Sequence, residues 1–484
     1  MTILRFRPPG ALLAIFLVST LLSVSPGCGP THVAEPEAPV LLVGVDGLEW
    51  EVLRPLMEAG RCPNLRALAE AGSYGRLGTF IPTHSPVVWT SIATGKRMEA
   101  HGITSFVDPQ GRAFTSSRRA GRALWNIADR YGLSSAVIGW WITWPVEPVR
   151  GVMVSGTSAV AQLADNWKPA LMPGVDDQVH PSELTDRVLE IAASAGSREE
   201  LQIVARENVF GTYSEGVMGA DEQVLIDQTL WSVQSDATYF QIARSLMPEF
   251  QTDLTLVYFG GPDVAGHRFW RQSHPEEFAY TGSSPAADAA LAEVLPNYYA
   301  WVDEMIGELV EMAGEGANVM VVSDHGMHAV ATKKPNQRNT TGDHQDGAPG
   351  VLIAAGPDIR PQGHLEQVLQ SGALPTHGSV YSVAPTILGL LGIPAARDME
   401  ARVYPNILTA AARERIGALD LVPTHDDGFR EPAMLAMSAE GEEEFKKRMA
   451  ELGYLDLPAA PTSRPVNPDG FVPDPEGLGG DGDR

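Results

Sequence analysis

Cysteine is almost absent from this sequence, because its 484 residues contain only Cys28 and Cys62. So few thiols exclude a disulfide framework as the basis of the fold. The chain must instead rely on a hydrophobic core, and 44% hydrophobic residues over this length are enough to bury a large one. We expect one large domain with an insertion, or two domains.

Positive charge is also scarce. Lysine and arginine number 35 against 60 aspartate and glutamate residues, which gives a formal net charge of -25. Proteins that bind nucleic acid hold its phosphate backbone with clustered Lys and Arg side chains, so we exclude a nucleic-acid polymer as a partner. An acidic chain can still provide a local metal site.

Long apolar runs are missing except near the start, where residues 11–22 follow the basic residues Arg5 and Arg7. This run is too short to span a membrane comfortably and is typical of a bacterial export signal. It closes on the letters SPGC, which resemble a lipoprotein signal with Cys28 as the lipidated first residue, although Pro26 departs from the usual small residues. We therefore expect an exported protein, periplasmic or at the cell surface, anchored by lipid to the bacterial outer membrane. The alternative is a plain secreted protein.

Composition divides the chain into four parts. Residues 1–28 are the expected lipoprotein-type signal peptide, and residues 29–38, rich in Pro, Glu and Ala, are a linker. Residues 39–457 form the expected main domain, in which we interpret residues 156–250 as a helical insertion or cap. The Pro-, Gly- and Asp-rich tail, residues 458–484, has few apolar residues and is predicted to be disordered.

Short apolar runs in the main domain alternate with longer amphipathic stretches, which is the pattern of an α/β fold. A central, mostly parallel sheet with helices on both faces is expected. Four runs have the character of buried strands: PVLLVGV, SAVIGWW, DLTLVYF and ANVMVVS. Helices are expected over residues 63–71, 122–131, 221–250, 296–313 and 380–391.

Three of the predicted strands are followed closely by an aspartate: Asp46, Asp263 and Asp324. In an open parallel sheet the carboxyl ends of the strands converge on one crevice. One such aspartate alone is most simply a solvated turn residue, because aspartate is common in turns. Three of them at equivalent positions indicate a shared site.

Histidines accompany these aspartates. His267 and His325 lie four residues and one residue beyond the second and third aspartate, and His344 precedes a further apolar run. Imidazole and carboxylate are the ligands that zinc prefers without thiolates, and manganese or iron could take the same set. Six ligands make two sets of three, which predicts two divalent ions about 3.5 to 4 Å apart, as in phosphoryl transfer. A lone histidine is most simply a surface or hydrogen-bonded residue, with His328 and His377 as reserve ligands.

The segment THSPVVWTSIATGK, residues 83–96, has residues typical of a helix start and of a helix end. The β-branched residues between them form helices poorly. Ser85 is a preferred N-cap type, Pro86 suits the first turn, and Gly95 falls where a C-cap glycine belongs. We therefore expect a helix with Ser85 as its N-cap. A hydroxyl there feels the positive end of the helix dipole and free backbone N–H groups, which favour an alkoxide or a phosphate.

Taken in order, these motifs resemble the type I phosphodiesterase and nucleotide pyrophosphatase family of the alkaline phosphatase superfamily, over residues 39–405. The resemblance implies an alkaline-phosphatase-like fold and a metal-dependent hydrolase of small-molecule phosphate esters. The letters EEEFKKRMAELGYL are similar to the closing helix of bacterial members. The main resemblance rests on VGVDGLEW, PTHSPVVWTSIATGKRMEAHGI, GWWITWPVEPVRGVMVS, YFGGPDVAGH, SDHGM, DGAPGVLIAAGP and YSVAPTILGLLGIP.

The resemblance also implies roles for single residues. The family's nucleophile lies ten residues before the glycine of its TG motif, which here is Ser85, and this serine also touches one of the ions. Thr83 is the neighbouring alternative. The two ligand sets that the resemblance implies are Asp46, Asp324 and His325 beside the nucleophile, and Asp263, His267 and His344 for the other ion.

One position departs from the family's pattern. Nucleotide pyrophosphatases place an asparagine five residues after the histidine of HGI to hold a phosphate oxygen, and this chain has Phe106 there. Such a contact must then come from Lys96, Arg97 or a backbone amide. We expect phosphodiesterase or pyrophosphatase action on nucleotide or lipid-headgroup diesters. The alternatives are phosphate or phosphonate monoester hydrolysis, and a surface binding protein that keeps the fold without catalysis.

Overall fold

The structure is a computed structural model that describes residues 36–109, 112–156, 176–194, 198–211, 217–278, 285–330, 340–365, 378–432 and 464–465. The expected signal peptide, the lipidation site at Cys28 and the expected closing helix lie outside these residues. None of the helices in the described ranges combines the length and the apolar character that a membrane span requires.

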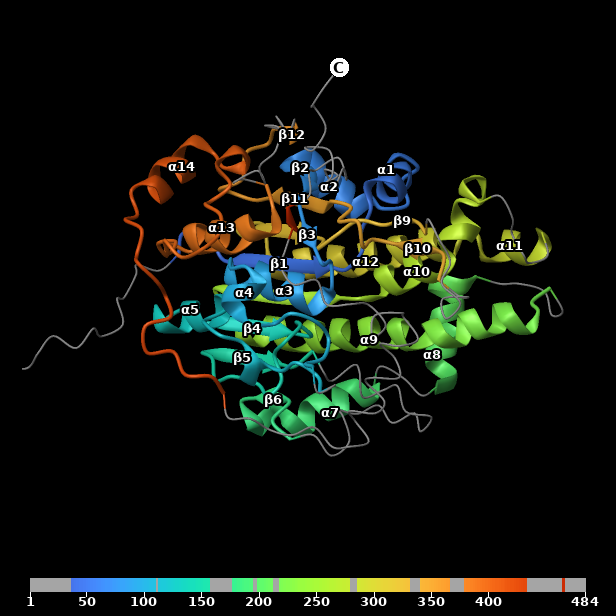
Figure 1. The fold of residues 1–484 in the computed structure, drawn as a ribbon, viewed down its shortest axis with the longest axis horizontal. Coiled ribbons are helices and arrows are strands. Elements are labelled where there is room, and N and C mark those ends of the chain that lie inside the picture. Colours follow the sequence, from blue (N-terminus) through green and yellow to red (C-terminus); the bar gives the residue numbers. More distant parts are fainter. Residues whose placement is uncertain are drawn as a thin grey trace, which may run out of the picture.

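A nine-stranded sheet forms the centre of the described chain, with the order β12-β2-β11-β8-β1-β7-β4-β5-β6 (Figure 1). The five strands from β8 to β5 are parallel, whereas β11 runs antiparallel to β8 and β2, and β6 runs antiparallel to β5. The mostly parallel sheet predicted from the sequence is therefore confirmed. The strands of the sheet are β1 (Val40–Val45), β2 (Ser73–Leu77), β4 (Ser135–Ile138), β5 (Gly151–Val154), β6 (Val179–His180), β7 (Leu254–Phe259), β8 (Asn318–Val322), β11 (Gly350–Ala355) and β12 (Gly363–His364).

Two small ribbons complete the described strands. β9 (His328–Ala329) pairs with β10 (Gly342–Asp343), and β3 (Phe80–Ile81) pairs with β13 (Arg464–Pro465). The strand β13 belongs to the tail that the sequence predicts to be disordered, and the other residues of that tail lie outside the described ranges.

The four predicted strands are the four adjacent strands β8, β1, β7 and β4, which form the middle of the sheet. Their side chains alternate between two hydrophobic cores, because successive residues of a strand point to opposite faces. Along β1, Leu41, Val43 and Val45 enter one core, and Val40 and Leu42 enter the other. Both faces need a cover, which explains why these runs are apolar throughout.

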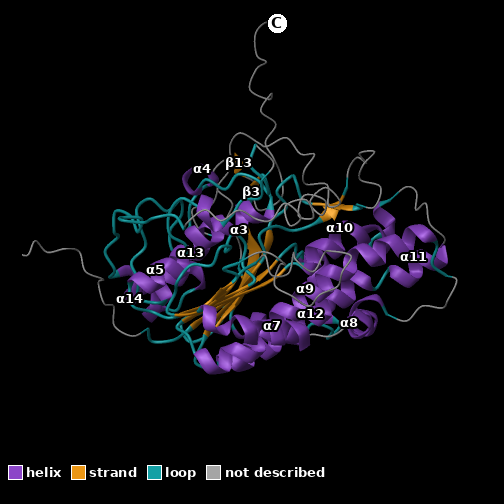
Figure 2. Cartoon of the chain, turned by 90° about the horizontal axis from the view of Figure 1, so that it is seen from below, coloured by secondary structure: helices purple, strands orange, loops and turns teal. Residues whose placement is uncertain are grey.

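Helices cover both faces of the sheet, as predicted, and Figure 2 shows the sheet between the two helical layers. One layer contains α9, α10 and α12, and the other contains α3, α5 and α13. The described helices are α1 (Trp50–Glu58), α2 (Pro63–Ala71), α3 (Ser85–Thr94), α4 (Met98–His101), α5 (Leu124–Arg130), α7 (Thr185–Ser194), α8 (Arg198–Ala205), α9 (Ala220–Phe250), α10 (Gly261–Ser273), α11 (Pro285–Leu291), α12 (Val294–Ala313), α13 (Val383–Leu390) and α14 (Ala410–Gly417).

The expected insertion is mostly helical where it is described, with the helices α7, α8 and α9 and a π-helical turn at Arg206–Phe210 that directly follows α8. Its long helix α9 packs on β7 and β4, and α7 packs on α9. Its short strand β6 extends the edge of the sheet. The segment is therefore part of the covering layer of the sheet, while its limits at residues 156 and 250 stay a prediction.

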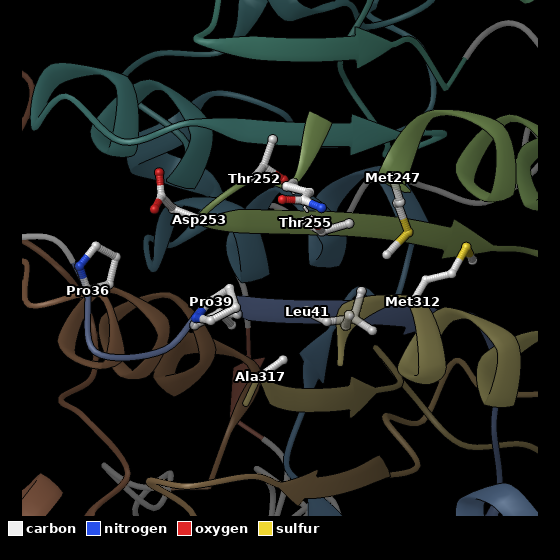
Figure 3. Close-up of a pocket in the computed structure, with 12 residues that line it drawn as sticks. Pro36, Pro39, Leu41, Met247, Thr252, Asp253, Thr255, Met312 and Ala317 are labelled. Atoms are coloured by element: carbon white, nitrogen blue, oxygen red, sulfur yellow. Dashed lines mark hydrogen bonds between the residues drawn. The ribbon is translucent and has the colours of Figure 1, made fainter. Parts of the chain in front are cut away.

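A pocket of about 370 Å³ opens at the amino ends of β1 and β7 (Figure 3). Asp46 follows the carboxyl end of β1, so this pocket lies at the opposite edge of the sheet from the predicted site. It is lined by Pro36, Pro39, Val40, Leu41, Met247, Gln251, Thr252, Asp253, Thr255, Met312, Ala313 and Ala317.

Candidate active site

The three predicted aspartates lie at one edge of the sheet because of its strand order. Asp46 directly follows β1, Asp324 follows β8 after one residue, and Asp263 lies in the first turn of α10, just beyond β7. β1 runs parallel between β7 and β8, so the ends of all three strands are adjacent. All three carboxylates are buried.

His325 lies at the centre of this cluster. Its Nε2 atom is 3.2 Å from Asp46 Oδ1, 3.3 Å from Asp324 Oδ2 and 4.0 Å from Asp263 Oδ1. The remaining two histidines also lie close to Asp263, and the ring of His344 stacks on that of His325. The Oδ1 atom of Asp263 is 3.4 Å from His267 Nε2 and 3.7 Å from His344 Nε2, and these two nitrogens are 3.1 Å apart. The structure thus brings all six predicted ligands together.

Backbone and side-chain acceptors orient the three imidazoles. His267 Nδ1 lies 2.9 Å from the carbonyl oxygen of Gly342, and His325 Nδ1 lies 2.9 Å from that of Gly326. A carbonyl only accepts, so in both rings Nδ1 donates its proton and Nε2 points into the cluster. In His344 the acceptor of the Nδ1 proton is the hydroxyl of Thr83 instead of a backbone carbonyl oxygen. This arrangement is how proteins usually hold metal-binding histidines.

The charges in the cluster are unbalanced without a cation. Burial alone would lower the pKa of His325, but the carboxylates of Asp324 and Asp46 outweigh it and raise this pKa to about 10. Burial and the neighbouring carboxylate of Asp46 raise the pKa of Asp324 well above its usual value. The two shifts share one contribution, because carboxylates lie close together in this buried cluster and favour a bound proton or another positive charge among them.

The residues present fit divalent metal ions. Asp46 Oδ1, Asp324 Oδ2 and His325 Nε2 are fully buried, and within the described chain none of them has a hydrogen-bond partner. Buried polar atoms without partners are costly, and carboxylate oxygens and imidazole nitrogens are common ligands of zinc. The donor atoms form two overlapping groups that could each hold an ion: Asp263, His267 and His344, and Asp46, Asp263 and His325.

The helix α3 corrects the predicted position of Ser85 by one residue. The N-cap is His84, with an extended backbone, because its carbonyl oxygen accepts the first helical bonds from the N–H groups of Val87 and Val88. Ser85 is the first helical residue, and no hydrogen bond within the described chain engages its hydroxyl. Gly95 ends the helix in the left-handed conformation, as predicted.

The segment around Ser85 is tied to both halves of the cluster. On one side, the Thr83 hydroxyl donates to the carbonyl oxygen of His344 at 3.0 Å and accepts from His344 Nδ1 at 2.9 Å. On the other side, Trp89 Nε1 donates to Asp46 Oδ2 at 2.9 Å. The indole ring of Trp89 packs directly against β1 at Gly44. A Cβ atom on this glycine would lie 2.7 Å from the ring, so a larger residue would not fit there.

The other candidate residues have different environments. Lys96 pairs with Asp398 and Asp426, and Arg97 pairs with Glu400, so both cations suggested for phosphate contact are held by carboxylates. The reserve ligand His328 pairs with Asp346 at 2.8 Å, and the other reserve, His377, lies outside the described residues.

Phe106 is buried beside the site. Its ring contacts those of His84 and Trp141, with centroid distances of 5.5 and 5.9 Å. Burial lowers the pKa of His84 to about 4, so this neighbour of Ser85 is an uncharged ring at neutral pH. The position that carries an asparagine in the resembled family is therefore part of an uncharged aromatic surface.

Sequence reasoning missed several residues that support the ligands. The Tyr258 hydroxyl donates to Asp46 Oδ2 at 2.6 Å, and the Ser323 hydroxyl donates to the carbonyl oxygen of His325 at 2.7 Å. Glu49 is buried and accepts from the N–H of Met327 at 3.3 Å, which holds the loop after His325. The sequence feature that could have identified these residues is their position, because each lies close in sequence to the carboxyl end of a central strand.

One family model and two known proteins are similar to this chain. A family model described as type I phosphodiesterase / nucleotide pyrophosphatase matches residues 40–376. A 2,3-bisphosphoglycerate-independent phosphoglycerate mutase from Symbiobacterium thermophilum is 25% identical over 229 residues, which are 44% of this chain and only 37% of that relative. The solved structure of phosphonoacetate hydrolase from Sinorhizobium meliloti 1021, in complex with phosphonoformate, aligns at 18% identity with a TM-score of 0.33, over 62% of this chain and 59% of that chain.

Proposed function

This chain belongs to the type I phosphodiesterase / nucleotide pyrophosphatase family, within the alkaline phosphatase superfamily, and we propose that it is a metal-dependent hydrolase of small phosphate esters. The observation that carries the proposal is the buried cluster of three carboxylates and three imidazoles beside the start of α3. We expect phosphodiesters or pyrophosphates as its substrates.

The six clustered residues are proposed to hold two divalent ions, with zinc as the first choice and manganese or iron as alternatives. Asp263, His267 and His344 are the ligands of one ion, in agreement with one of the two donor groups. Asp46, Asp324 and His325 are the proposed ligands of the other. Such ions neutralise phosphate charge and lower the pKa of a nearby hydroxyl.

Ser85 is the proposed nucleophile and a further metal ligand. Its Oγ atom forms a bond to phosphorus while the bond from phosphorus to the leaving oxygen breaks, and water then hydrolyses the phosphoserine. Among the first backbone N–H groups of α3, those of Val87 and Val88 already bond to His84, and Pro86 has none. The N–H of Ser85 itself is therefore the backbone donor proposed to contact a phosphate oxygen.

Monoester hydrolysis, of phosphates or phosphonates, is the second candidate. The observation that favours it is Phe106, because an aromatic ring replaces a polar side chain at that position. A mono-aryl and a bis-aryl phosphate distinguish the two functions, since the preferred class is turned over with the higher kcat/KM.

The first prediction tests the nucleophile. We expect Ser85→Ala to lower kcat on the preferred aryl phosphate by at least about a thousand-fold, by analogy with other nucleophile deletions, while the bound metal determined by elemental analysis is largely retained. Ser91→Ala is the matched control, because Ser91 lies in the same helix and its hydroxyl lies 3.0 Å from His101 Nε2, which is not one of the clustered residues. Unchanged activity in Ser85→Ala together with metal-free wild-type protein would support the non-catalytic binding protein instead.

We also propose that the chain is exported and anchored by lipid at Cys28. The support is the sequence alone, namely the apolar run at residues 11–22 and the following SPGC. The described domain begins shortly afterwards, with β1 at Val40, so a short linker would join the anchor to the fold.

A further inference from the structure

The insertion helix α9 carries a buried carboxylate that the proposed mechanism does not use. Asp236 is fully buried, and its two oxygens accept hydrogen bonds from the backbone N–H groups of Gly260 and Gly261, each at 2.9 Å. These two residues are the N-cap and the first residue of α10. Asp236 therefore caps α10 from the preceding helix, α9.

The cap has a direct physical role, because the first N–H groups of a helix have no carbonyl partner within it. A carboxyl group at this end satisfies those groups with its oxygens. In α10 the first turn contains Asp263, and His267 follows one turn later. The capped backbone thus lies only two residues before the first of these proposed ligands.

A third contact and tight packing fix the position of Asp236. The hydroxyl of Tyr298, from α12, donates to Asp236 Oδ2 at 3.0 Å. A Cβ atom on Gly261 would lie 1.7 Å from that hydroxyl and 2.5 Å from the same carboxylate oxygen. Since no side chain fits between them, the backbone of α10 rests directly on the carboxylate and the phenol.

We propose that Asp236 is a positioning residue, which fixes the first turn of α10 and through it the placement of Asp263 and His267 for metal binding. This inference rests on the proposed function. Metal sites require their ligand atoms within about 0.2 Å of the ideal distances, so a small shift of this turn weakens binding. The insertion thereby supports one of the two proposed metal sites.

Zinc titration calorimetry of the full chain, after removal of metal with a chelator, tests the inference. The variant Asp236→Asn keeps the size of the side chain but replaces one accepting oxygen with a donor. His267→Ala identifies which of two binding events belongs to the site of Asp263, His267 and His344. We expect Asp236→Asn to weaken that event by about ten- to a hundred-fold and to leave the other unchanged.

Asp303→Asn is the matched control. Asp303 is also fully buried, and it accepts from the backbone N–H groups of Asn64 and Leu65 at 3.1 and 2.7 Å, in the first turn of α2. No proposed ligand lies on α2, so this variant loses an equivalent cap away from the metals. We expect it to lower the thermal midpoint while both zinc affinities stay at the wild-type values.

Each result is decisive. Wild-type zinc affinity in Asp236→Asn, or an equal loss in Asp303→Asn, would overturn the positioning role. If Asp236→Asn fails to fold, Tyr298→Phe removes the third contact and keeps both backbone bonds. We expect it to weaken the same binding event by a smaller factor, and wild-type affinity here would again overturn the inference. Wild-type protein that binds no zinc, manganese or iron contradicts the proposed function itself.

Discussion

At the scale of single residues, the cluster depends on partners that hold each ligand in place. Thr83 is the best example, because its hydroxyl donates to the carbonyl oxygen of His344 and accepts from the imidazole of the same residue. Both bonds direct His344 Nε2 toward His267. A hydroxyl engaged in this way is poorly placed as a nucleophile, which favours Ser85 over Thr83.

A substitution at Thr83 separates the two roles. We expect Thr83→Val to need a zinc concentration about ten- to a hundred-fold higher for half-maximal activity, because His344 loses its partner. At saturating zinc its kcat should approach that of the wild type. Thr83→Ser, which keeps the hydroxyl, serves as the control. A loss of activity in Thr83→Val that zinc cannot restore would identify Thr83 as the nucleophile.

The clustering of the six candidate ligands could be predicted from the sequence, whereas the residues that hold them in place could not. Asp46, Asp263 and Asp324 follow runs that are visibly strands, and parallel strands bring such positions together. Thr83 and His344 are 261 residues apart, and neither lies at the end of a central strand. Their contact depends on how α3 docks against the sheet, which local patterns do not encode.

At the scale of elements, α3 is held at both ends. Its start is tied to the cluster through Thr83 and Trp89, and just past its end Lys96 pairs with Asp398 and Asp426. Lys96 is only 7% exposed, so its ammonium group is nearly removed from water and depends on these carboxylates. Helix α3 therefore connects the clustered residues at the centre of the sheet to the loops that carry Asp398 and Asp426.

The pairing of Lys96 predicts a dependence of stability on pH. Burial opposes ionisation of Asp398, but its bond to Lys96 outweighs this and lowers its pKa in the folded protein. A carboxyl group with a lowered folded-state pKa stabilises the fold above its unfolded pKa of about 3.9, and this contribution is lost as the pH falls through the folded value. We expect Lys96→Met to lower the free energy of unfolding by about 1 to 3 kcal/mol near neutral pH.

Urea unfolding near pH 7 and near pH 3 measures this effect, and the difference from wild type should shrink in acid. Arg66→Met is the control, because Arg66 forms an exposed pair with Glu70 on one helix and contributes little. An equal difference at both pH values contradicts a contribution from the ionised Asp398.

The elements themselves were predicted best where they are long and periodic. The expected helices correspond closely to α2, α5, α9, α12 and α13, and the strand runs to the four central strands. The start of α3 was wrong by one residue, because Ser85 and His84 are both polar and only the observed bonds to His84 identify the cap. Short strands such as β5 and β6 were missed, because two to four residues carry no clear period.

At the scale of the whole molecule, the order of the strands explains the site. β1 lies at the centre between β7 and β8, which places the ends of three strands side by side. The antiparallel direction of β11 could not be predicted, because an apolar run is the same in either direction. The cap on α10 was equally hidden, since it joins Asp236 and Gly260 on two different helices, and no local pattern links residues 24 positions apart.

The proposed lipid anchor is tested on the whole protein. We expect full-length wild type, expressed in a bacterium, to partition into detergent in a phase-separation assay, and Cys28→Ser to partition into the aqueous phase. Cys62→Ser is the control, because Cys62 is buried in the core. Wild-type protein in the aqueous phase would instead indicate a plain secreted protein.

The direction of β1 has one more consequence. The chain enters the domain at the amino end of this strand, and Asp46 follows its other end, about 20 Å away for six residues at roughly 3.3 Å each. If the proposed lipid at Cys28 anchors the chain, that span would place the proposed active site on the side of the domain that faces away from the bilayer. Diffusible esters would then arrive there directly, without first leaving a lipid layer.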